Sequence, residues 1–200
     1  MKKIIALILV VGCLLAMSSC SLFNKKQDHT GISAVQSAID SSAPKSADIN
    51  VEFDSTLGKL EGEYDVVYNE DGTATVDYTY EKFNNFSADT AVRDEIKSSY
   101  TGTVVVAADG SISSGLDGVA SVEAVTFELN LNPDKLVSYE AGSSVLNAKV
   151  AAANTASVIG VAINADVDLV ITVGANRVTS VVMTYALTNG TVTITAVYHY

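Results

Sequence analysis

Tight-turn signals between runs of alternating apolar and polar residues most constrain the fold of this chain. Asn189-Gly190 separates two such runs, and Asn-Gly is typical of a two-residue type I′ hairpin turn. That turn predicts four successive apolar cross-strand pairs, namely Leu187 with Val192, Tyr185 with Ile194, Met183 with Ala196 and Val181 with Tyr198. A period of two favours strands with one buried face. The chain is therefore predicted to be mainly β.

A second hairpin is predicted around Asn69-Glu70-Asp71-Gly72, where Asp-Gly again separates alternating runs. A three-residue loop with Gly72 in the left-handed conformation pairs Tyr64 with Tyr78, Val66 with Val76 and Tyr68 with Ala74. A slip of one residue would turn every apolar side chain to the wrong face, so pairing and burial agree on one register. One face of this hairpin then carries Tyr64, Val66, Tyr68, Val76, Tyr78 and Tyr80.

A third hairpin completes a meander of three strands near the end of the chain. A loop of Gly174-Ala175-Asn176 pairs Ile171 with Thr179, Leu169 with Val181, and Val167 with Met183. This register sends the same face inward as the Asn189-Gly190 hairpin does.

Helical spacing occurs in short segments only. Ile32, Val35 and Ile39 predict an amphipathic helix over Gly31–Ser42, which Pro44 ends. Two more short helices are expected at Ala151–Ile159, with Gly160 as its cap, and at Asp89–Lys97.

The remaining alternating segments add further strands. They comprise the run from Asp48, with Ile49, Val51 and Phe53 on one face, and the segments Tyr100–Ala108, Val119–Leu131 and Ser144–Val150. We therefore expect residues 31–200 to form one domain. It is a single curved antiparallel sheet or half-barrel of about nine strands, with two or three short helices on its concave side.

The N-terminal segment has the composition of an export signal. Lys2 and Lys3 precede an uncharged run from Ile4 to Met17, which is shorter than the about 20 residues that span a bilayer. Residues 1–19 are predicted to be a signal peptide, residues 20–30 a tether, and a permanent transmembrane helix is not expected.

The segment Met17-Ser18-Ser19-Cys20 resembles a bacterial lipobox. The resemblance implies a diacylglyceryl group on the sulfur of Cys20, cleavage before that residue, and a cell-envelope protein anchored by lipid outside the cytoplasmic membrane. Val10-Val11-Gly12-Cys13 fits the same pattern more loosely, which leaves Cys13 as the alternative lipidation site.

Composition removes several classes of function. The chain carries 23 acidic against 12 basic residues, so phosphate backbones would be repelled and a nucleic-acid partner is not expected. Both cysteines, Cys13 and Cys20, lie in the signal segment, and only two histidines, His29 and His199, are present. No metal site, cofactor or enzymatic activity is predicted, because thiolate and histidine ligands and a Gly-x-Ser-x-Gly nucleophile motif are lacking.

Two observations leave alternatives open. Glu61, Glu63 and Asp65 alternate along one strand, either as a solvated face or as the paired acids of a glycosidase. The tyrosine face of the first hairpin is either packed core or the lining of a cavity for an apolar ligand.

The predicted architecture resembles the LolA-like class of lipoprotein carriers. The shared features are an N-terminal helix, a long meander and small inserted helices on a chain with a predicted lipid anchor. That resemblance covers architecture only, and it implies a concave apolar surface for acyl chains with the helices as a lid. The leading hypothesis is therefore binding of a lipid or other apolar ligand by the concave face. The alternative is a non-enzymatic surface protein with a fully packed core that engages another envelope or host component.

Overall fold

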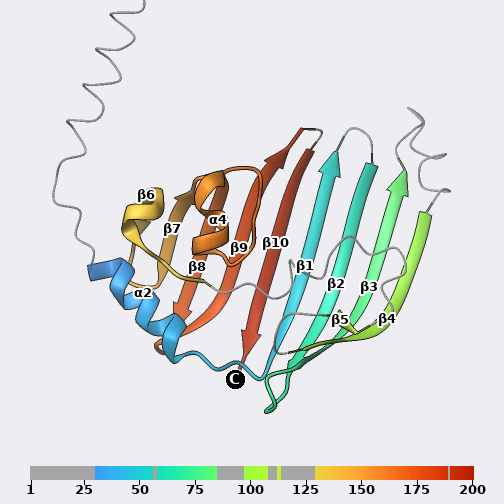
Figure 1. The fold of residues 1–200 in the computed structure, drawn as a ribbon, viewed down its shortest axis with the longest axis horizontal. Helices are drawn as coiled ribbons and strands as arrows, with labels where there is room; N and C mark the ends of the chain where they lie inside the picture. Colours follow the sequence, from blue (N-terminus) through green and yellow to red (C-terminus); the bar gives the residue numbers. More distant parts are fainter. Residues whose placement is uncertain (1–29, 56–57, 85–96, 108–111, 114–128, 189) are drawn as a thin grey trace, which may run out of the picture. The chain divides into compact units, whose positions relative to one another are not determined.

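The computed structural model describes residues 30–55, 58–84, 97–107, 112–113, 129–188 and 190–200, and residues 31–200 form one compact unit. The described strands form one antiparallel sheet in the order β5-β4-β3-β2-β1-β10-β9-β8-β7-β6 (Figure 1). The strands are β1 Ser46–Ser55, β2 Gly58–Tyr68, β3 Ala74–Asn84, β4 Lys97–Val106, β5 Ile112–Ser113, β6 Leu136–Ala141, β7 Val145–Val150, β8 Val167–Gly174, β9 Arg177–Leu187 and β10 Gly190–His199. The predicted mainly β architecture of one unclosed antiparallel sheet with short helices is confirmed.

The first and last strands of the described part lie side by side in the middle of the sheet. β1 pairs with β10 along its whole length, from Ser46 opposite His199 to Ser55 opposite Gly190 (Figure 1). On its other edge β1 pairs with β2. This one long-range pairing therefore joins the hairpins before residue 107 to the meander that ends the chain.

One face of the sheet is apolar and covered. Helix α2 (Thr30–Ser41) buries Ile32 and Val35 in the same core as the inward strand residues, which confirms the predicted N-terminal helix. Gly31 lies against the Cβ of Ala141 in β6, and the Ser42 hydroxyl accepts a hydrogen bond from the backbone N–H of Val178 in β9 at 3.0 Å. The helix therefore runs across the apolar face from β6 to the start of β9.

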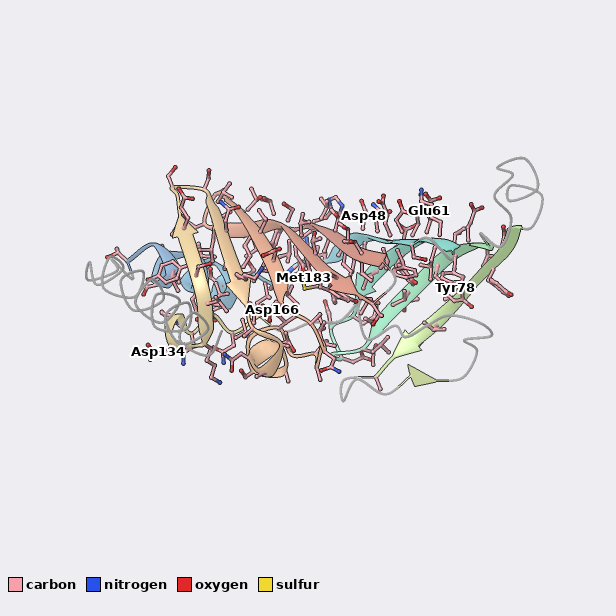
Figure 2. All side chains as sticks on the ribbon, turned by 90° about the horizontal axis from the view of Figure 1, so that it is seen from above. Asp48, Glu61, Tyr78, Asp134, Asp166 and Met183 are labelled. Atoms are coloured by element: carbon pink, nitrogen blue, oxygen red, sulfur yellow. The ribbon has the colours of Figure 1, made fainter. Side chains whose placement is uncertain are left out.

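The predicted helix over Ala151–Ile159 is shorter than expected. A 3₁₀ turn, η3 (Ala152–Asn154), leads into the four-residue helix α4 (Thr155–Val158), and Gly160 follows with a φ of 82°. α4 lies on one side of the sheet in Figure 2, and its last residue, Val158, and the following Ile159 join the core. A second 3₁₀ turn, η2 (Pro133–Lys135), precedes β6.

The first hairpin has the predicted register. Tyr64 is opposite Tyr78, Val66 is opposite Val76, and Tyr68 is opposite Ala74. Gly72 has a φ of 82°, a left-handed conformation that glycine adopts without steric cost. The Asp71 carboxylate accepts hydrogen bonds from the backbone N–H and hydroxyl of Thr73, and these bonds lower the pKa of Asp71.

The predicted register of the last hairpin is wrong by two residues. Leu187 is opposite Gly190, and Met183 rather than Tyr185 is opposite Ile194, so Gly190 begins β10 instead of occupying the turn. Gly190 lies opposite Ser55 in β1, where a Cβ would collide with the backbone oxygen of Asp54 and lie 2.6 Å from the Cβ of Ser55. The glycine is therefore needed where β10 approaches β1.

The predicted register between β8 and β9 is also wrong by two residues. Ile171 is opposite Val181, and Gly174 is opposite Arg177, so only Ala175 and Asn176 form the turn. Both residues have a positive φ, 52° and 61°, as a type I′ turn requires. An irregularity between Thr172 and Val173 supplies the remaining shift. A shift of two preserves the buried face, so the alternating pattern is equally satisfied by both registers.

Other predicted segments fall partly or wholly outside the described residues. These include 1–29, most of Asp89–Lys97, and 119–128 of the strand predicted over Val119–Leu131; residues 129–131 are not strand. The strands predicted at Tyr100–Ala108 and Ser144–Val150 correspond to β4 and β7. β6 was not predicted, because a register irregularity between Leu136 and Ser138 interrupts its alternation. Among the described helices, none has the length and apolar character needed to cross a bilayer.

The opposite face of the sheet is polar, and its acidic residues lie in rows across β1, β2 and β3. Asp48, Asp65 and Asp77 are directly opposite one another, and so are Glu52, Glu61 and Glu81. Asp48 and Glu61 project from this face in Figure 2, away from α4. Like charges at directly opposite positions repel.

Two nitrogen-containing side chains, Lys59 and His199, lie beside these acidic rows. Lys59 pairs with Glu61, and the His199 ring lies 2.9 Å from the Asp48 carboxylate. Glu61, Glu63 and Asp65, weighed above as paired acids, belong to this solvent-facing surface.

Candidate ligand cavity

A cavity of about 540 Å³ lies at the C-terminal end of α2, against β2, β9 and β10. Its apolar walls come from five side chains: Ile39, Pro44, Leu129, Val178 and Val181. Three tyrosines, Tyr68, Tyr198 and Tyr200, and two polar residues, Asp40 and Ser42, complete the lining. The volume lies within the range of about 300–1,000 Å³ that is common for small-molecule sites.

Hydrogen bonds fix the helical wall of the cavity. The Gln36 side-chain amide donates to the Asp40 carboxylate at 2.7 Å, and its oxygen accepts from the backbone N–H of Leu131 at 2.7 Å. The Ser42 hydroxyl donates to the carbonyl of Ala38 at 2.6 Å. Because Ser42 also accepts from β9, the last turn of α2 is held at the edge of the cavity.

The three tyrosines add phenol groups to the lining of the cavity. The Tyr200 hydroxyl donates to the carbonyl of Val178 at 2.6 Å, and the Arg177 guanidinium lies 4.9 Å from the centre of the Tyr200 ring. Burial, and then the neighbouring Tyr68 and Tyr200, raise the pKa of Tyr198. Burial likewise raises the pKa of Tyr68, so both phenols stay protonated and can donate hydrogen bonds.

Most of the tyrosine face predicted as a ligand surface is packed core. Tyr64, Val66, Val76, Tyr78 and Tyr80 are each at most 6% exposed, and of the six predicted residues Tyr68 lines the cavity. The Tyr78 ring lies over Gly102, the residue opposite it in β4, so closely that a Cβ there would approach the Tyr78 hydroxyl to 2.6 Å. The Tyr64 ring covers Gly62 in the same way.

Sequence reasoning singled out Tyr68 but missed the other residues that make the cavity. Tyr198 was predicted to face inward, but nothing local to the sequence indicated that Asp40, Leu129 and Tyr200 would lie beside it. Cys20 and the lipobox residues Met17, Ser18 and Ser19 lie outside the described residues, as does His29. Within the described ranges, no group of three or more acidic, histidine or cysteine side chains is arranged to hold a metal ion.

The buried tyrosines predict a loss of stability at alkaline pH. Burial raises the pKa of Tyr64 to about 12, above the value of about 10 expected in the unfolded chain. The protonated fold is fully favoured below pH 10, and its stability falls as pH rises from about 10 towards 12, because the unfolded chain loses protons first. Urea unfolding across this pH range measures the effect. Tyr64→Phe should flatten the decline, and equal declines in the wild type and this variant would contradict the assignment.

Comparisons of the chain with protein-family models, with curated proteins and with solved structures give no significant match.

Proposed function

We propose that this chain is a lipid-anchored protein of the bacterial cell envelope whose cavity binds a lipid or another apolar ligand. The cavity between α2, β2, β9 and β10 is the observation that carries the proposal. Its walls combine aliphatic side chains with a few polar groups, the composition of sites that bury an apolar molecule and orient one end of it. The anchor comes from the lipobox pattern at Cys20, and it would hold the binding domain outside the cytoplasmic membrane.

Neither the core nor the polar face argues for a catalytic function. Glu61, Glu63 and Asp65 face solvent, and His199 pairs with Asp48 on the exposed face of the sheet. The second candidate is a surface protein that engages another envelope or host component. The acidic rows of β1 to β3 and the packed tyrosine core favour that alternative.

Filling the cavity is expected to abolish binding of an apolar probe. Leu129 is partly exposed and lines the cavity, so Leu129→Trp replaces its side chain by a larger aromatic one in the site without opening the core. Fluorescence of the neutral probe N-phenyl-1-naphthylamine should increase when the wild-type protein is added. With the variant the increase should be smaller by a factor of about ten or more, because the tryptophan ring occupies the site.

Leu187→Trp is the matched control, since Leu187 is an exposed leucine at the end of β9 and does not line the cavity. This variant should bind the probe as the wild type does. Native mass spectrometry of each purified protein would show whether a lipid is carried from the cell. Equal probe fluorescence in both tryptophan variants, with no lipid retained by the wild type, would favour the surface-interaction function.

A further inference from the structure

The charge of the cavity lining distinguishes among the apolar ligands that it could take. Asp40 is the one ionised side chain among the described residues that line the cavity, and Gln36 holds its carboxylate at the edge by a hydrogen bond of 2.7 Å. The other polar groups are a serine hydroxyl and three phenols. A ligand with a carboxylate or phosphate head would therefore meet a fixed negative charge and no lining cation.

The aromatic rings add a second preference for positive charge. The face of a tyrosine ring attracts cations electrostatically, and the Tyr200 ring already has the Arg177 guanidinium 4.9 Å from its centre. Tyr68 and Tyr198 also line the cavity, and within the described part of the chain no hydrogen bond occupies either hydroxyl. These two rings and the Asp40 carboxylate line the same cavity.

From this arrangement we propose that the cavity selects amphiphiles with a cationic ammonium head, which Asp40 and the tyrosine rings bind while the aliphatic walls hold the tail. This inference rests on the proposed function, because it names the ligand class of the same cavity. The net charge of −11 acts in the same direction, since it raises the local concentration of cations and lowers that of anions.

Three probes with the same tail separate head-group charge from apolar binding. At neutral pH octylamine is cationic, octanol is neutral and octanoate is anionic, as lysine, serine and glutamate side chains are. Isothermal titration calorimetry would use residues 20–200 with Cys20→Ser, which carries no acyl chain of its own and retains the compact unit 31–200. Circular dichroism confirms that each variant is folded. We expect octylamine to bind more tightly than octanol, and octanol more tightly than octanoate.

Two isosteric variants test the role of Asp40. Asp40→Asn should weaken octylamine binding by up to about fivefold, the upper end for an exposed ion pair, and should leave octanol binding unchanged. Asp54→Asn removes the same charge from β1, where Asp54 faces solvent and does not line the cavity, and should change neither affinity appreciably.

The results of these titrations distinguish selection for cations from apolar binding, the proposed function on which it rests. Octanoate binding as tight as octylamine binding, or equal weakening of octylamine by both variants, would overturn the selection for cations while apolar binding stands. Failure of all three probes to bind would overturn the proposed function itself.

Discussion

Gly190→Ala is expected to lower the free energy of unfolding by about 3 kcal/mol, which corresponds to a fall of about 6–12 °C in melting temperature. The new Cβ would collide with the backbone oxygen of Asp54 and would lie 2.9 Å from the Phe53 ring. A backbone atom cannot rotate away, so β1 and β10 must separate at this end. Thermal and urea unfolding followed by circular dichroism measure the loss.

The size of this effect reflects the place of Gly190 in the sheet. Its neighbour across the pair, Ser55, donates its hydroxyl to the carbonyl of Gly58 at 2.8 Å and accepts from the N–H of Gly58 at 3.0 Å. Moving Ser55 would therefore disturb the link from β1 to β2 as well. Among the described strands β1–β10 is the pairing that joins the two groups, and no other strand pairing of this part of the chain replaces it.

Gly142→Ala serves as the matched control. A Cβ at Gly142 would lie 3.3 Å from the nearest atom, the Val145 oxygen, in the turn between β6 and β7 at the edge of the sheet. This variant should stay within about 1 kcal/mol of the wild type. Equal losses in the two variants would show that the close approach at Gly190 does not limit stability.

Cys20→Ala is expected to abolish incorporation of radiolabelled palmitate and to release the protein from the membrane fraction. In the proposed anchor the diacylglyceryl group is carried by the sulfur of Cys20, so an alanine at this position leaves no site for it. Covalent acyl chains contribute about 0.8 kcal/mol per buried CH₂, and their loss removes most of the affinity for a bilayer. Labelling of the intact cell and fractionation of its membranes give the two readouts.

Cys13→Ala distinguishes the two candidate lipidation sites. It should keep full labelling, because Cys13 lies within the apolar run 4–17 of the proposed signal peptide, before the proposed cleavage site. Labelling that survives in Cys20→Ala and disappears in Cys13→Ala would assign the anchor to Cys13 instead.

The success and failure of sequence reasoning have one physical cause. At the Tyr68–Ala74 hairpin a slip of one residue would expose the tyrosines, so the alternating pattern alone excludes it. At Gly190 and at Asn176 the competing registers differ by two residues and bury the same face, so only turn preference could choose between them. At Gly190 the observed register differs from the one that turn preference favours, and Gly190 lies against β1, a strand more than a hundred residues away.

The cavity lay beyond prediction for a related reason. Its walls bring Ile39 from α2, Tyr68 from β2 and Val181 from β9 together. They meet because β1 and β10 lie between β2 and β9, an order set by tertiary pairing and not by any local pattern. Individual strands and their inward residues can be predicted from periodicity, whereas the order of strands determines which inward residues share a site.

The aligned carboxylates on the polar face also govern how molecules of this protein meet one another. When two copies approach through this side of the sheet, aspartate and glutamate rows confront identical rows, and the resulting potential pushes the molecules apart. Dissolved salt shortens the reach of that repulsion to about 8 Å at physiological ionic strength. Crowded copies would therefore remain separate through their own surface charge, and face-to-face stacking of these sheets would become easier only in concentrated salt or acid.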